Sequence, residues 1–190
     1  MTIAVFGCGG GSTAPDHCGA FSACGGNIVG TWELSSYCAG AFATSTCEVG
    51  VGSVSFEGSV TTTFKTDGTY ATTPPTSLAM SLTYSAGCFG DAGASLSCAD
   101  IKENSATSSV TCTGDIASSC TCNIATTSPS DSAPTGTYSV SGTQVISKGD
   151  NQSNSSTMDY CVQGDTLSIA TNSSPTSTTP ARLIGTYHRK

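Results

Sequence analysis

The alternation of apolar and polar residues along the chain predicts short β-strands. It is clearest over residues 53–65, where Val54 and Phe64 fall on one face and serine, threonine and charged residues fall on the other. Strict alternation of this kind predicts a strand with one buried face. The segment ends at Asp67-Gly68, a dipeptide that favours a tight hairpin turn, and an alternating pattern resumes at residues 69–72. We therefore predict one strand over 53–65 and a hairpin with the strand that follows.

The same pattern of strand, turn and strand recurs twice near the C-terminus. The second hairpin covers residues 136–147 with its turn at Ser141-Gly142, and the third covers residues 158–169 with its turn at Gly164-Asp165. Further strands are expected at residues 30–38, 109–113, 120–126 and 183–189, and polar loops at 148–156 and 171–181. About ten short strands with this spacing predict an all-β sandwich or barrel, and an up-and-down connection is the simplest arrangement.

Composition agrees with a β-rich fold and limits the kinds of partner. Only 10% of the 190 residues are charged, and strong helix formers are scarce. The chain is long enough for one domain with one sizeable core. Its net charge is −7, and it has only six basic residues. Because phosphate backbones and anionic lipid surfaces are bound by clustered lysine and arginine, the composition argues against both as partners.

Cysteine is the most informative residue type. The chain has eleven cysteines, which are scattered through the sequence. Scattered cysteines are typical of exported domains that are held together by disulfides, and we expect such a framework here. The alternative is zinc binding, but Cys120-Thr121-Cys122 is too tight for a zinc pair, and His17 and His188 lie at opposite ends of the chain. We therefore expect no metal site.

The N-terminal residues suggest how the odd cysteine is used. Val5-Phe6-Gly7-Cys8 resembles the signal of bacterial lipoproteins, in which the cysteine becomes acylated, and a Gly/Ser-rich segment follows it. Lipid on Cys8 would leave ten cysteines for five disulfides. Only seven residues precede Cys8, fewer than a signal peptide needs, so the alternative is a disordered apolar tail. We assign residues 1–27 to this N-terminus and a flexible linker.

Some disulfide pairings are constrained by the sequence. Ten cysteines are expected to pair, in an order that the sequence does not give: Cys18, Cys24, Cys38, Cys47, Cys88, Cys98, Cys112, Cys120, Cys122 and Cys161. Cys120 and Cys122 lie two apart on one strand face, where a direct bridge would be strained. Each is expected to pair elsewhere, with Cys88, Cys98 and Cys112 as nearby candidates. The stretch 85–122 is predicted to be a Cys-rich insertion that disulfides order.

Two ends of the chain carry a resemblance to the lipocalin family. Gly30-Thr31-Trp32 begins the first expected barrel strand, and the last strand brings Arg189 near the C-terminus. In lipocalins a Gly-x-Trp motif places its tryptophan at the floor of the barrel, and an arginine from a late strand packs across it. The three hairpins also look like those of bacterial lipocalin-like lipoproteins. The resemblance implies a small antiparallel up-and-down barrel over residues 28–190, with Trp32 and Arg189 in contact.

The resemblance implies a binding module rather than an enzyme. Its interior would be lined by Trp32, Phe56, Phe64, Tyr70, Tyr138, Val140, Leu167 and Ile169, and would hold a small apolar ligand. The alternative is a structural or interaction protein of the cell surface, with a filled barrel and no ligand. The sequence holds no recognisable nucleophile–base pair and no phosphate loop, so we expect no catalysis and no cofactor. A lipid anchor on Cys8 would hold the protein at the bacterial cell envelope, on the outer membrane or cell surface.

Overall fold

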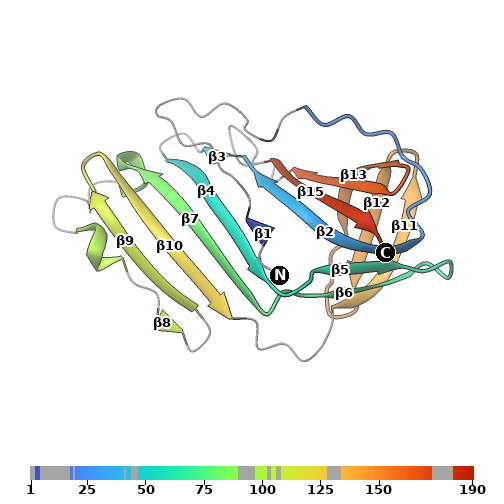
Figure 1. The fold of residues 1–190 in the computed structure, drawn as a ribbon. Coiled ribbons are helices and arrows are strands. Elements are labelled where there is room, and N and C mark those ends of the chain that lie inside the picture. The colour runs from blue at the N-terminus through green and yellow to red at the C-terminus, as the bar shows by residue number, and fades with distance from the viewer. Residues whose placement is uncertain are drawn as a thin grey trace.

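The computed structural model confirms the predicted all-β class. It describes residues 3–4, 18, 20–40, 42–43, 47–89, 97–101, 104–105, 108–127, 134–172 and 182–190. These residues form a closed antiparallel barrel of eight strands and a second, open sheet beside it (Figure 1). We call the open sheet the outer sheet.

The barrel follows the chain in the up-and-down order that the sequence favoured. Its strands are β2 (Gly30–Ala39), β5 (Thr61–Phe64), β6 (Thr69–Thr73), β11 (Thr135–Ser141), β12 (Gln144–Gly149), β13 (Ser156–Gln163), β14 (Thr166–Asn172) and β15 (Arg182–Arg189). Each strand pairs with the next in this order, and β15 pairs with β2 to close the barrel. The three predicted hairpins are confirmed. Gly68, Gly142 and Gly164 take φ of 79°, 59° and 58° in their turns, a conformation that glycine adopts without strain.

The outer sheet contains the region that was predicted as a Cys-rich insertion. Its strands are β1 (Ile3–Ala4), β3 (Phe42–Ala43), β4 (Glu48–Glu57), β7 (Ser77–Ser85), β8 (Asn104–Ser105), β9 (Ser108–Asp115) and β10 (Ser119–Thr127). They are arranged in the order β1-β4-β7-β10-β9-β8, with β3 beside β4. Two short 3-10 turns, η1 (Ala86–Cys88) and η3 (Cys98–Asp100), lie between β7 and β8. β9 and β10 match the strands expected at 109–113 and 120–126, whereas β7 was not predicted.

The prediction of one strand over 53–65 is wrong. β4 ends at Glu57 and β5 begins at Thr61, and the two strands belong to different sheets. Gly58 has a φ of 84°, and the backbone N–H of Thr76 donates to the carbonyl oxygen of Glu57 at 2.8 Å. β4–β5 and β6–β7 therefore form one long hairpin that bends at Gly58. Its tip belongs to the barrel and its base belongs to the outer sheet (Figure 1).

The two faces of the outer sheet differ in chemistry. The strand registers place Val54, Met80, Ile124 and Val110 in one row across four strands. Neighbouring rows on the opposite face hold small uncharged side chains, as in the row Thr83, Thr121 and Thr113. One face of this sheet is therefore apolar, and the other presents hydroxyl and methyl groups to solvent.

The barrel and the outer sheet have separate cores. Six side chains that are no more than 4% exposed make the barrel core: Ile28, Trp32, Phe64, Val145, Tyr160 and Leu167. The core of the outer sheet is made of Cys98, Cys112, Ile116, Cys120 and Cys122, with Tyr84, Phe89, Ile101 and Val110 packed against it. Burial of cysteine side chains thus takes the place that large apolar side chains have in the barrel.

The expected disulfide framework is confirmed for the ten described cysteines. The pairs are Cys18–Cys38, Cys24–Cys161, Cys47–Cys88, Cys98–Cys120 and Cys112–Cys122. Cys120 and Cys122 each pair with a different partner, as predicted. Cys98 and Cys112 are those partners, whereas Cys88 bonds to Cys47. Cys8 and His17 lie outside the described residues.

Candidate functional site at the closed end of the barrel

Trp32 is the centre of the closed end of the barrel. It lies near the start of β2 and is 0% exposed. Its indole Nε1–H donates to the carbonyl oxygen of Ile28 at 2.7 Å. A buried indole N–H needs such a partner, since an unsatisfied donor in the core is costly. The hydrogen bond therefore fixes the tryptophan against the segment that precedes its own strand.

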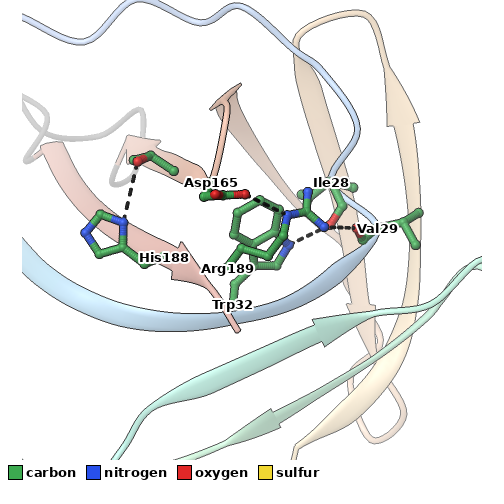
Figure 2. A network of polar contacts seen from close by, with 7 residues as sticks. Ile28, Val29, Trp32, Asp165, His188 and Arg189 are labelled. Carbon is green, nitrogen blue, oxygen red and sulfur yellow. Dashed lines mark hydrogen bonds and ion pairs between the residues drawn. The ribbon is translucent and has the colours of Figure 1, made fainter.

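Arg189 covers the outer face of this tryptophan. The pairing of β15 with β2 places Arg189 opposite Trp32, and the guanidinium carbon lies 4.2 Å from the ring centroid (Figure 2). Nη1 also donates to the carbonyl oxygen of Val29 at 3.1 Å, and Nε lies 3.7 Å from Oδ1 of Asp165. The Asp165 side chain is 86% exposed, so this ion pair adds little. The cation–π contact and the backbone hydrogen bond hold the arginine. This is the arrangement that the lipocalin resemblance implies.

Gly30 explains why a glycine precedes the tryptophan. Its φ is 143°, a conformation that other residues rarely adopt. A Cβ atom at this position would lie 2.6 Å from Nη1 of Arg189. Any side chain here would displace the guanidinium from Val29 and Trp32. The positive φ therefore favours glycine at this position, and the close approach of Arg189 adds to that preference.

A short strap crosses the closed end below Trp32. We define the strap as residues 24–29, which were assigned to the end of a flexible linker and the start of the barrel. Gly25 forms an isolated parallel bridge with Cys161: its N–H donates to the carbonyl oxygen of Tyr160 at 3.1 Å, and its own carbonyl accepts from Val162 N–H at 2.8 Å. The hydroxyl of Tyr160 donates to the carbonyl oxygen of Gly26 at 2.8 Å. This part of the linker is therefore anchored to β13 and is not a free tether.

Most of the residues predicted to line the barrel lie in or against its core. Phe64 and Leu167 belong to the core with Trp32, and Tyr70, Tyr138 and Ile169 pack against it. The ring of Phe64 meets that of Tyr138 edge to face at 4.9 Å between centroids. These side chains come from strands on opposite sides of the barrel, and they fill the space above Trp32.

Two of the predicted lining residues do not lie in the barrel interior. Phe56 is on β4, in the outer sheet, and its ring lies 5.9 Å from that of Tyr37. The prediction failed because it treated residues 53–65 as one strand. Val140 is 46% exposed, because it lies near the tip of the β11–β12 hairpin where the hairpin projects beyond the core.

Three core residues were missed by the sequence analysis: Ile28, Val145 and Tyr160. Val145 and Tyr160 lie in predicted hairpins, and continuing the alternation from Tyr138 and Leu167 across the turns would have found them. Ile28 carries no such signal. It is buried because the strap turns back under Trp32.

Two tyrosines face each other toward the other end of the barrel. A register shift between Thr186 and Tyr187 on β15 brings Tyr187 opposite Leu34 and Gly185 opposite Tyr37. Burial raises the pKa of Tyr187, and the neighbouring Tyr37 raises it further; burial also raises the pKa of Tyr37. Both phenols therefore keep their protons at neutral pH. They add polarity to this end of the barrel without adding charge.

Within the described residues, no group of three or more His, Cys, Asp or Glu side chains is placed to hold a metal ion, and no charged side chain is buried. His188 is exposed, and its Nδ1 lies 3.5 Å from the hydroxyl of Thr166. In the described part of the chain, no helix is long and apolar enough to cross a bilayer.

These features define the class of the protein: an eight-stranded up-and-down β-barrel, closed at one end by an arginine-covered tryptophan, with a disulfide-rich second sheet. Comparisons with family models, with curated proteins and with solved structures found no match. The resemblance to lipocalins therefore stays a prediction from the sequence.

Proposed function

We propose that this chain is an exported structural or interaction protein of the cell envelope, in which a filled, lipocalin-like barrel supports the outer sheet. The observation that carries this proposal is the packing around Trp32, where the barrel core consists of the protein's own side chains. Small barrels are often filled in this way and then have no room for a ligand.

The polar atoms of the core support the same proposal. The indole N–H of Trp32 and the hydroxyls of Tyr138 and Tyr160 all donate to backbone carbonyls of the chain, at 2.7, 2.7 and 2.8 Å. A ligand site needs a few polar groups that are free to orient the bound molecule. At the closed end, these three groups already have partners within the protein.

The disulfides support an exported location. Five bridges in 190 residues are typical of an oxidising compartment, since cytosolic thiols are kept reduced. In this proposal Cys8 carries a lipid that anchors the protein to the membrane, and the domain itself needs no basic surface for attachment.

One observation favours a second candidate function, the binding of a small apolar ligand inside the barrel. Several inward side chains are only partly buried, among them Tyr70, Met158, Ile169 and Tyr187. In this alternative, a ligand enters from the end opposite Trp32 and completes the packing of these residues.

Two measurements on the full chain, expressed with its native upstream sequence, test the proposal. The non-reducing intact mass should correspond to five disulfides plus an acyl adduct, and Cys8→Ser should remove the adduct alone. Several alkylatable thiols without lipid would contradict export. The second measurement is a titration with an apolar dye such as anilinonaphthalene sulfonate, for which we expect no saturable binding. Saturable one-to-one binding that quenches Trp32 would overturn the filled barrel and favour the ligand-binding alternative.

A further inference from the structure

The five disulfides differ in how accessible they are. Four of the cysteines lie in the core of the outer sheet and are no more than 4% exposed. Among the ten described cysteines, Cys24 alone is exposed, while its partner Cys161 is 9% exposed and the cysteines of the Cys18–Cys38 and Cys47–Cys88 bridges are half-buried. Exposed disulfides are the ones that react readily with thiols, whereas buried ones are protected. Cys24–Cys161 therefore offers the most exposed cysteine of the five bridges to an attacking thiolate, which reaches it from the side of Cys24.

This bridge lies on the strap that closes the barrel. Apart from the disulfide, the strap is held to β13 by backbone hydrogen bonds and by the hydroxyl of Tyr160, which donates to Gly26, and its residue Ile28 is buried in the barrel core. Gly25 and Gly26 follow Cys24 directly, with φ of 72° and 110°. Glycine loses more conformational freedom on ordering than any other residue, so a Gly-Gly segment is costly to hold in place. The covalent bond offsets that cost.

The strap also completes the surroundings of Trp32 and Arg189. Ile28 accepts the indole hydrogen bond of Trp32, and Val29 accepts from the guanidinium of Arg189. Both acceptors are backbone carbonyls of the strap, beside Trp32 and Arg189 (Figure 2). Movement of the strap would therefore remove a partner from the tryptophan and from the arginine at once.

We propose that Cys24–Cys161 is a redox latch that controls opening of the barrel at its closed end. A thiolate of a dithiol reductant attacks Sγ of Cys24, the Cys24–Cys161 bond breaks, and Cys161 leaves as a thiolate that takes up a proton. The second thiol of the reductant then attacks the mixed disulfide, which releases Cys24 and leaves the reductant as a disulfide. The freed strap detaches from β13 and exposes the end of the barrel at Trp32.

The single tryptophan of the chain makes this proposal directly measurable. Any Cys8 thiol that carries no lipid is first blocked with a maleimide, and the folded protein is then titrated with dithiothreitol. At each step, newly formed thiols are trapped with iodoacetamide and mapped by peptide mass spectrometry, and acrylamide quenching of Trp32 is recorded. We expect Cys24 and Cys161 to be alkylated before the other eight described cysteines. Quenching should increase several-fold at the same dose of reductant.

Two variants separate a latch from a merely structural bridge. Cys24→Ser with Cys161→Ser should give the high quenching without reductant and should no longer respond to low doses. Cys47→Ser with Cys88→Ser removes a bridge in the outer sheet, and this matched control should keep the response of the parent protein. The proposal is overturned if Cys24–Cys161 is reduced with or after the buried bridges. It is also overturned if Trp32 stays shielded once both cysteines are alkylated in the parent protein, a result that does not depend on how well either variant folds.

Discussion

The barrel and the outer sheet both bury enough surface to stay folded, but they do so in different ways. The barrel encloses its interior and fills it with large side chains such as Trp32, Tyr160 and Leu167. The outer sheet is open, and in its main buried cluster four of the five residues are disulfide-bonded cysteines. A closed barrel has no free edges and encloses one face, whereas an open sheet leaves more of its surface to solvent. The difference teaches that disulfides are concentrated where the fold can enclose least.

Both regions have bridges of moderate span, Cys18–Cys38 at 20 positions on the barrel and Cys47–Cys88 at 41 in the outer sheet, but the shortest and the longest bridges differ in location. In the outer sheet, Cys112–Cys122 and Cys98–Cys120 join residues that are 10 and 22 positions apart, and so act as local staples. In the barrel, Cys24–Cys161 joins residues 137 positions apart and ties the strap to β13. The staples shape one hairpin and the turn beside it, whereas the long bridge closes the fold.

The largest effect is expected from Trp32→Ala. Truncation of a fully buried tryptophan should cost about 3–5 kcal/mol of the free energy of unfolding, because the cavity cannot collapse in a closed barrel. If the two cores are separate, hydrogen exchange should increase across the barrel strands, while the disulfide-linked β9–β10 hairpin keeps its protection. Denaturant unfolding gives the free energy, and exchange mapped by peptide gives the location.

Val140→Ala is the matched control for this prediction. Val140 also lies on a barrel strand, but it is 46% exposed, so its truncation leaves no cavity in the core. Its cost should lie within about 0.5 kcal/mol, as for other surface substitutions. Equal loss of protection in the outer sheet and in the barrel of Trp32→Ala would show that the two regions unfold as one unit.

The next largest effect is expected from the double variant Cys112→Ser with Cys122→Ser. Loss of a bridge that closes a loop of this length should cost about 3 kcal/mol, by the chain-entropy model. Two buried serine hydroxyls would add to the loss. The increase in hydrogen exchange should be confined to β9, β10 and η3, the reverse of the result for Trp32→Ala. Loss of protection in β13 or β14 would contradict separate cores.

Local chemistry explains which parts of the fold the sequence could predict. The three predicted hairpins were found because their turns carry Asp67-Gly68, Ser141-Gly142 and Gly164-Asp165, where glycine takes a positive φ. The change of sheet within residues 53–65 was not found, because apolar residues alternate on both sides of Gly58. A period of two indicates a strand but does not say to which sheet the strand belongs.

The site was predicted in part. Trp32 and Arg189 were identified from the Gly-x-Trp motif and the arginine of the last strand. In the structure, Arg189 approaches Gly30, the glycine of that motif. The strap was missed, since residues 24–27 have the composition of a linker. They are ordered by contacts with Tyr160, Cys161 and Val162, which are more than 130 positions away in the sequence. Contacts of that range leave no periodic signal in a single sequence.

A smaller effect is expected from Gly30→Ala. The new Cβ would be forced into a rare backbone conformation and would displace Nη1 of Arg189, so we expect a cost of about 1–3 kcal/mol. Because the arginine leaves the indole, the fluorescence spectrum of Trp32 should change while the outer sheet is unaffected. Gly142→Ala is the control: its φ is also positive, at 59°, but a Cβ there would meet nothing within 4 Å. An unchanged Trp32 spectrum in Gly30→Ala, despite the loss of stability, would separate backbone strain from displacement of Arg189.

The smallest effect concerns the tyrosines inside the barrel and depends on pH. Burial, and secondly the neighbouring Tyr37, raise the pKa of Tyr187 above its ordinary value of 10.0. The folded protein therefore keeps a proton that the unfolded chain releases, so stability is fully present below pH 10 and decreases as the pH rises through the folded pKa. Tyr187→Phe removes this proton, and we expect the midpoint of alkaline unfolding to move to higher pH. At neutral pH, stability should change by less than about 1 kcal/mol.

Tyr37→Phe should act in the same direction, because burial raises the pKa of Tyr37 as well. Circular dichroism against pH gives the midpoint, and exchange mapping should show the barrel opening before the outer sheet. If the outer sheet opened first, or if the midpoint of Tyr187→Phe stayed in place, the alkaline limit would not lie in the barrel.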